Sequence, residues 1–344
     1  MEPLPWLVPI PVVPRPYRGL AEADAPFAIA MAGERIDAFG ATASAPTEEL
    51  AWCDLRDEPA AGSIATLGAL SAGVYRGKYL EGIGASGLEL GLARTEPLDR
   101  SVALRELAVA RHLDAVLGDD RVRFVLCESV LLGDRAAISV RSGDFVRFSN
   151  LVWLAHRIDF FRKKSHASLS LTRFLRLFGA ALDPALENPT PAALSGAFVR
   201  SFEAARAALG ALAAAGVASV LDVDDIDARG RIVRLAAPRF AAANDSVDGA
   251  PVAKRYADLA WFFGTRFRGI ATAGPPVSQV ERDFAGALAD AFAATGAELQ
   301  APAFSVREAP AAGAIEAELA RWSTVGDRDE LLATVAPFLA RLPR

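Results

Sequence analysis

One helical pattern between two strand-like segments constrains the fold of this chain more than any other feature. Leucine and valine side chains recur at helical spacing over residues 100–117. Asp99 or Ser101 can cap the first turn, and Gly118 follows the last one. The sequence therefore predicts one long helix with a defined beginning and end.

The segments on both sides of this helix have the character of strands. Residues 73–84, "GVYRGKYLEGIG", predict a strand or a hairpin. Residues 121–143 predict two strands joined at Gly133 and Asp134. We therefore expect the first half of the chain to be a sheet with one helix.

The second half is predicted to be mostly helical. Helical patterns cover residues 150–162, 168–180, 190–215, 251–270, 276–295, 312–323 and 328–341. Residues 221–240 interrupt them with an acidic loop, a turn at Gly230 and a short strand over 231–235. We expect an α+β fold with a strand-rich lobe over residues 1–149 and a helical lobe over 150–344. This is the layout of a protein kinase, although the pattern alone also fits other α+β folds.

Composition argues against several classes of function. The net charge is −5 and no sustained basic block is present, which argues against a nucleic-acid partner. Cys53 and Cys127 form no CxxC pair, and three histidines do not have the spacing of a zinc site. The proline-rich N-terminus is unlike a signal peptide, and the longest apolar run, Ala207 to Leu221, is shorter than the roughly 20 residues that cross a bilayer. We expect a cytoplasmic protein with no membrane partner.

Residues 79–150 carry three short motifs in a fixed order. "YLEGIG" comes first, an Arg-Glu pair in the predicted helix follows, and "VRSGDFVRFSN" comes last. Glu81 and Glu106 are 25 positions apart, and the last motif contains Arg141 and Arg147. In this order and spacing the segment resembles selenoprotein O, the kinase-like protein adenylyltransferases. It also resembles related kinase-like proteins that accompany peptide-antibiotic modification clusters.

The resemblance implies a kinase-like fold that uses ATP and magnesium. In that family a lysine of the first motif holds nucleotide phosphates and pairs with the helix glutamate, here Glu106. The two arginines, here Arg141 and Arg147, face an inverted ATP, so that AMP is transferred to a protein hydroxyl. An Asp-Asn pair and a later aspartate supply the base and the magnesium ligands.

This chain departs from the family at the lysine. Glu81 occupies that position, and a carboxylate cannot neutralise phosphate. At ~4 Å from Glu106, two like charges would repel by about 4 kcal/mol at an effective dielectric constant of roughly 20, so one would protonate or turn away. Lys78 could substitute, but this requires a bulge or a register slip, because residues 78 and 81 face opposite sides of a regular strand.

The acidic loop departs as well. Alignment from Gly230 backwards places Asp224 and Asp225 at the family's Asp-Asn pair, whereas alignment from the preceding glycine favours Asp222. The later magnesium aspartate falls on Arg234, and an arginine cannot bind magnesium. Two of the three charges needed for nucleotidyl transfer are therefore inverted.

Glu106 also has a purely structural interpretation as a helix carboxylate paired with a basic neighbour. If Arg234 replaces a bound metal, we expect it to form an ion pair with Glu81 or with Glu106. The two interpretations of Glu106 remain open at this stage.

The remaining candidates have structural interpretations too. Arg141 and Arg147 are interpreted as surface residues, with phosphate contact as the alternative. The aspartates of residues 222–227 are expected to form a solvated turn rather than a metal loop. The aromatic run over residues 255–267 is expected to be core.

The function expected from these residues is that of a degenerate kinase-like pseudoenzyme. It would act by binding a protein or peptide, such as an active homologue or a modifying enzyme, or by forming an oligomer. The alternative is an active nucleotidyl- or phosphotransferase that uses ATP and magnesium with rearranged residues. For that alternative, the catalytic candidates are Lys78, Glu106 and Asp224, the cofactor-binding candidates are Glu81, Arg141, Arg147 and Arg234, and the metal candidate is Asp225. A third interpretation is an unrelated α+β domain that matches the motifs by chance.

Overall fold

The computed structural model carries side chains and describes most of the chain after residue 97. The described residues are 28–31, 34–37, 50–51, 72–75, 78–81, 98–132, 136–142, 145–156, 158, 170–186, 189–219, 221, 225–235, 238–240, 246–275, 277–296, 299–307, 309 and 311–341. The proline-rich N-terminus, Cys53 and Asp224 lie outside them.

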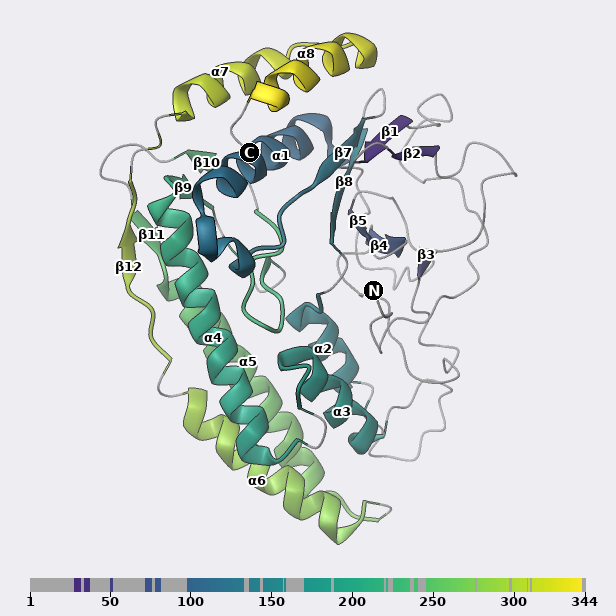
Figure 1. Cartoon of the computed structure of the whole chain (residues 1–344). Coiled ribbons are helices and arrows are strands. Elements are labelled where there is room, and N and C mark those ends of the chain that lie inside the picture. Colours follow the sequence, from purple (N-terminus) through teal and green to yellow (C-terminus); the bar gives the residue numbers. More distant parts are fainter. Residues whose placement is uncertain are drawn as a thin grey trace.

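The main sheet is antiparallel and is built from the first part of the chain (Figure 1). Its strands are β1 (Ala28–Met31), β2 (Glu34–Asp37), β3 (Leu50–Ala51), β4 (Ala72–Tyr75), β5 (Lys78–Glu81), β6 (Leu98–Asp99), β7 (Ser129–Leu132) and β8 (Ala136–Ser142). Their order is β2-β1-β7-β8-β5-β4-β3, and β6 pairs with β8. The predicted hairpin corresponds to β4 and β5, and the two predicted strands to β7 and β8.

The long predicted helix is α1 (Arg100–Val116), which follows β6 directly. The Asp99 side chain accepts a hydrogen bond from the Ser101 backbone N–H at 2.7 Å and so caps the first turn. Gly118, at φ 52°, adopts the left-handed conformation after the last turn. A short 3₁₀ helix, η2 (Gly118–Arg123), then leads towards β7.

The second part of the chain is helical, with two small two-stranded sheets. The helices are α2 (Phe148–His156), α3 (Leu171–Leu182), α4 (Pro191–Ala214), α5 (Ala250–Ala271), α6 (Gln279–Gly296), α7 (Ala312–Trp322) and α8 (Arg328–Arg341). The small sheets pair β9 (Val217–Ala218) with β10 (Arg239–Phe240) and β11 (Ser246–Asp248) with β12 (Ala303–Ser305). All seven predicted helices are present; α8 has the predicted bounds, and the other six have shifted ends. The predicted strand over residues 231–235 is not present, because only Ile232 forms bridges there, to Phe124 and to Ile226.

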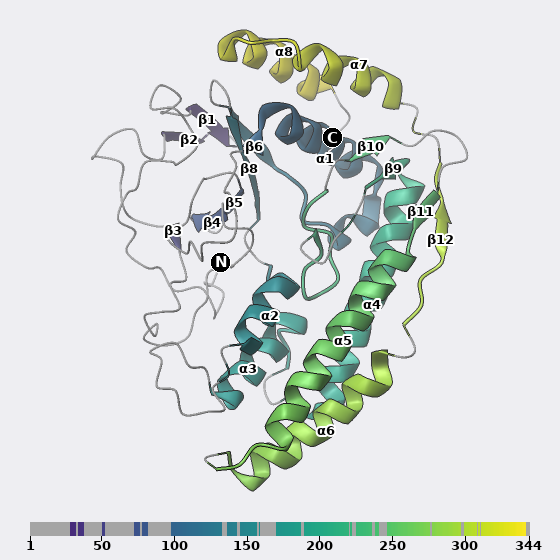
Figure 2. The same ribbon diagram turned by 180° about the vertical axis from the view of Figure 1, so that it is seen from behind.

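Two apolar clusters hold these elements together. The larger one joins α1, the segment 124–127, and helices α2 to α6. Aromatic rings fill its centre, and they include Tyr256, Phe263 and Phe267 of the run that was expected to be core. The smaller cluster joins the outer side of α1 to α7 and α8, which lie across the end of the molecule in both ribbon views (Figure 2).

The fold is therefore a helix-rich mixture of helices and antiparallel strands, as the α+β prediction requires. Within the part of the chain that the structure describes, no helix is long and apolar enough to cross a membrane.

Candidate functional site

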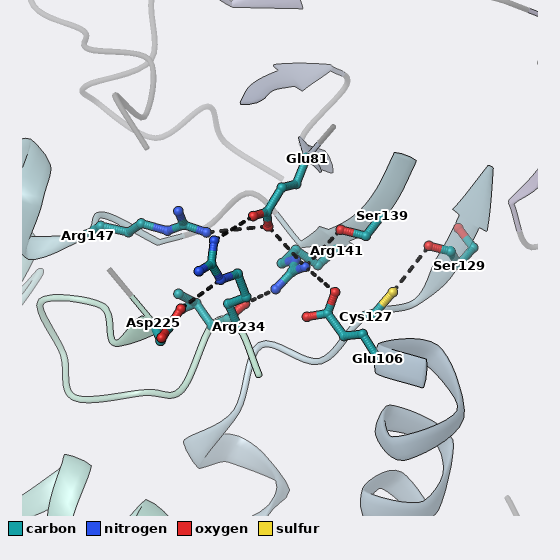
Figure 3. Close-up of polar contacts among 10 residues, drawn as sticks. Glu81, Glu106, Cys127, Ser129, Ser139, Arg141, Arg147, Asp225 and Arg234 are labelled. Carbon is teal, nitrogen blue, oxygen red and sulfur yellow. Dashed lines mark hydrogen bonds and ion pairs between the residues drawn. The ribbon is translucent and has the colours of Figure 1, made fainter. Parts of the chain in front are cut away.

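Six charged side chains from four parts of the chain meet between the sheet and the loop that precedes β10 (Figure 3). We call this group the charge cluster; it consists of Glu81, Glu106, Arg141, Arg147, Asp225 and Arg234. All six are among the residues that the sequence singled out. Five of them are buried, and the Arg234 side chain is 33% exposed.

Arg141 lies at the centre of the charge cluster. Its Nη2 donates to Glu106 Oε2 at 2.9 Å and lies 3.3 Å from Glu81 Oε2. The same nitrogen lies 2.9 Å from Ser139 Oγ, and Nη1 donates to the Val233 carbonyl. A fully buried guanidinium thus contacts both glutamates, which lie near each other as the resemblance implied.

Arg234 joins the second carboxylate oxygen of Glu81 to the acidic loop. Its Nη1 donates to Glu81 Oε1 at 3.0 Å, and its Nε lies 2.7 Å from Asp225 Oδ1. The predicted ion pair of Arg234 is confirmed, and its partner is Glu81. The described side chains do not fit a magnesium ion here, because Arg234 already occupies the Asp225 carboxylate that would be a ligand.

Arg147 approaches the same carboxylate from the segment after β8. Its Nη2 lies 3.7 Å from Glu81 Oε2, and its guanidinium lies over the Tyr79 ring at 5.0 Å and the Phe145 ring at 5.7 Å. Arg141 and Arg147 both have 0% exposure. Their interpretation as surface residues is therefore wrong.

The sheet register places these side chains. Strand alternation puts Tyr79 and Glu81 on one face of β5, and in β8 the residues directly opposite them are Arg141 and Ser139. The ladders from Lys78 to Glu81 are continuous on both sides of β5, towards β4 and towards β8. The bulge that would bring Lys78 into the place of Glu81 is thus not present in this strand.

The surroundings shift the pKa values of the two glutamates in opposite directions. Burial acts to raise the pKa of Glu81, but Arg141, Arg147 and Arg234 together outweigh it and lower that pKa. Burial raises the pKa of Glu106, and the charge of Glu81 adds to this effect against the opposing charge of Arg141. Of the two glutamates, Glu81 therefore loses its proton at the lower pH, as expected for two carboxylates that share one site.

The described part of the acidic loop is buried, so its interpretation as a solvated turn is wrong for Asp225 and Asp227. Asp227 accepts hydrogen bonds from the backbone N–H groups of Arg229 and Arg231 at 2.9 and 2.8 Å and from Arg231 Nε at 2.7 Å. Burial still raises the pKa of Asp227, against these contacts and the charge of Arg231. Asp227 acts as the internal cap of the turn, and Asp224 lies outside the described residues.

Three residues near the charge cluster were not singled out. Tyr79 is fully buried, and burial raises its pKa to about 12 against the opposing charge of Arg147. Cys127 is buried near Glu106. Burial and the negative charge of Glu106 together raise the pKa of the Cys127 thiol to about 12. Ser139 contacts Arg141. Strand alternation could have found Tyr79, since it is two positions from Glu81, but no sequence pattern marks Cys127 or Ser139.

The chemistry of the charge cluster is that of a closed ionic network. Three arginines face three carboxylates, and each carboxylate lies within ion-pair distance of at least one arginine. Across the described ranges, no three histidine, cysteine, aspartate or glutamate side chains lie together so that they could hold a metal ion.

Comparison with known proteins adds no relative to this picture. No family model matches the chain, and no curated protein shows significant similarity to it. The resemblance to selenoprotein O therefore depends on the three sequence motifs alone.

Proposed function

We propose that this chain is a kinase-like pseudoenzyme in which an internal ionic network has replaced the metal and nucleotide chemistry, and that it acts by binding a protein or peptide. The observation that carries the proposal is the Glu81 carboxylate. It lies within 3.0 to 3.7 Å of nitrogens of Arg234, Arg141 and Arg147. It thus fills the position between the three guanidinium groups where an anionic ligand would have to bind.

The energetics of a buried carboxylate support this interpretation. An ionised group in a dry environment needs partners in good geometry, and removal of one partner leaves an expensive unpaired charge. A nucleotide phosphate would have to displace Glu81 from its arginines and would bring further negative charge next to Glu106 and Asp225. The network therefore opposes phosphate binding at this position.

The strand order supports the kinase-like part of the proposal. Helix α1 is inserted between β5 and β7, and β8 returns to lie between those two strands. With this order, the buried Glu106 of α1 lies near Glu81, the residue of β5 that corresponds to the family lysine. On this proposal, residues 1–149 form the strand-rich lobe and residues 150–344 the helical lobe.

The test measures the thermal unfolding of the protein with ATP and the transfer of AMP from ATP. Each measurement is made with and without magnesium or manganese. A ligand at about 100 times its dissociation constant stabilises a protein by about 2.7 kcal/mol, a shift of a few degrees. We expect no metal-dependent shift and no AMP adduct by intact mass. A metal-dependent shift with adduct formation on a protein substrate would contradict the proposal.

The second candidate is an active transferase with rearranged residues, and the convergence of Arg141 and Arg147 on one carboxylate favours it. A guanidinium group binds phosphate as well as carboxylate, so a nucleotide that displaced Glu81 would meet two arginines already in place. In this case ATP must displace Glu81, so Glu81→Ala should increase the ATP-induced shift and Arg147→Met should abolish it. If ATP changes the unfolding temperature of neither the wild type nor Glu81→Ala, this candidate has no support.

A further inference from the structure

The two C-terminal helices, α7 and α8, form a separate apolar cluster with the outer side of α1. Ala103, Leu104 and Ala108 of α1 contribute to it, together with Leu132 of β7 and Ala137 of β8. The members from α7 and α8 are Ile315, Leu319, Trp322, Leu331, Val335 and Phe338. None of these buried residues belongs to the larger cluster, and only the partly buried Val130, Phe240 and Leu339 pack against both clusters among the described residues.

Polar contacts fix the same helices along the length of α1. Arg105 forms two contacts with Glu316, at 2.6 and 2.9 Å, and this pair is partly shielded from solvent. Arg100, at the beginning of α1, donates to the carbonyls of Val325 and Gly326 between α7 and α8. These contacts run in opposite order along the two helices, so α7 lies antiparallel to α1.

The other side of α1 carries the charge cluster and its surroundings. Glu106 follows Arg105 directly and binds Arg141. Arg111 donates to the Glu128 carbonyl at 3.0 Å, which ties α1 to the segment that contains Cys127. A movement of α1 therefore changes the position of Glu106 and the cover over Cys127 together.

The helix pair α7–α8 is held in place by side-chain contacts, and features of both helices weaken its attachment. Pro337 lies inside α8, where it removes one helical hydrogen bond. The Trp322 indole N–H is buried without an acceptor among the described residues, which opposes its packing. Neither helix is joined to the main sheet by backbone pairing.

We propose that α7–α8 is a detachable strap that sets the position of α1 from the outside and thereby controls whether Glu106 stays in contact with Arg141. With the strap in place, α1 is held from both sides and the charge cluster is closed. With the strap released, α1 is held by its inner contacts alone, so it moves away from the segment around Cys127 more often and solvent reaches that segment more often.

Thiol labelling of Cys127 in the full-length chain tests this control. A Cys53→Ser background leaves Cys127 as the single cysteine. Trp322→Ala removes the largest side chain of the strap, and we expect it to raise the labelling rate of Cys127 by about tenfold or more. Amide exchange should rise in α7, α8 and α1, and it should not change in α5 and α6.

Phe292→Ala is the matched control, since it removes a buried aromatic ring from α6 in the larger cluster. It should raise exchange in α5 and α6 without a selective rise in α7 and α8. If Trp322→Ala fails to fold, Glu316→Gln carries the test, and its own control is Glu203→Gln, which weakens the exposed pair of Glu203 with Arg206. Faster labelling of Cys127 in Glu316→Gln but not in Glu203→Gln supports the strap. A rise in exchange confined to α7 and α8, with Cys127 labelled at the wild-type rate, would overturn it.

Discussion

Glu81 and Arg234 are 153 positions apart in the chain, and their side chains meet at 3.0 Å. One oxygen of the Glu81 carboxylate faces Arg234, and the other faces Arg141 and Arg147. The Glu81 carboxylate is thus a point where the sheet and the acidic loop are joined.

Glu81→Gln should strongly destabilise the protein. The substitution keeps the shape of the side chain but leaves three arginines with one carboxylate fewer in a buried site. Removal of one partner from a buried ionic network typically costs about 3–5 kcal/mol. Urea unfolding should show a loss of this size in the free energy of unfolding, at an unchanged slope.

Glu203→Gln is the control for that loss, because Glu203 pairs with Arg206 on the exposed side of α4. Exposed pairs of this kind contribute roughly 0–1 kcal/mol. If Glu81→Gln were as mild as Glu203→Gln, the charge cluster would not hold the two parts of the molecule together.

Stability should depend on pH in two opposite ways. Burial and the Glu81 charge raise the Glu106 pKa, so the native state binds more protons than the unfolded state over the window above the ordinary glutamate value. The contribution of Glu106 is therefore complete at low pH and is lost as pH rises through its raised pKa. The three arginines lower the Glu81 pKa, so the contribution of Glu81 is present above the ordinary value and is lost as pH falls through the lowered pKa.

Two variants separate the contributions of Glu106 and Glu81 to the free energy of unfolding, measured with urea over about pH 3 to 8. Glu106→Gln should remove the decline on the alkaline side of the ordinary glutamate pKa and leave the acid decline in place. Glu81→Gln should flatten the acid decline. Identical pH profiles for wild type and Glu106→Gln would show that Glu106 keeps the same pKa in both states.

Tyr79→Phe should be neutral or stabilising, by up to about 1 kcal/mol. The Tyr79 hydroxyl is fully buried, and it has no hydrogen-bond partner within the described part of the chain. Its removal therefore relieves a desolvation cost and keeps the ring against Arg147 and Phe145.

Tyr256→Phe is the matched comparison. The Tyr256 hydroxyl lies 2.9 Å from Ser201 Oγ and donates to the Ser201 carbonyl at 3.3 Å. Its loss should cost about 1 kcal/mol and leave Ser201 with one partner fewer. Equal thermal shifts for the two variants would contradict the difference in hydrogen bonding.

Gly230→Ala should prevent stable folding or cost about 3 kcal/mol or more. Gly230 has φ 80°, and a methyl group there would clash with the Ser201 carbonyl oxygen. Gly118→Ala is the control, since φ is 52° but, among the described residues other than its chain neighbours, none has an atom within 4 Å of the added carbon. It should cost only about 1–2 kcal/mol, the conformational term alone. Circular dichroism during urea unfolding would compare the two.

Much of the fold could be predicted because it depends on local patterns. The period of apolar residues and the Asp99 cap defined α1, and the corresponding periods defined the later helices. The segment 231–235 was expected to be a strand, but within it only Ile232 forms backbone bridges, which are too few for a strand. Ile232 exchanges backbone contacts with Arg123 and Val125 instead.

The sequence by itself determined which ionisable residues lie on β5, α1 and β8, and it predicted that Glu81 and Glu106 meet and that Arg234 pairs with one of them. It could not determine that Arg141 and Arg147 are buried, because an arginine in a strand has the same local pattern whether it faces solvent or a carboxylate. The tertiary structure decided this, since only the packing of the acidic loop and α1 against β5 and β8 removes water and supplies the partners that a buried guanidinium requires.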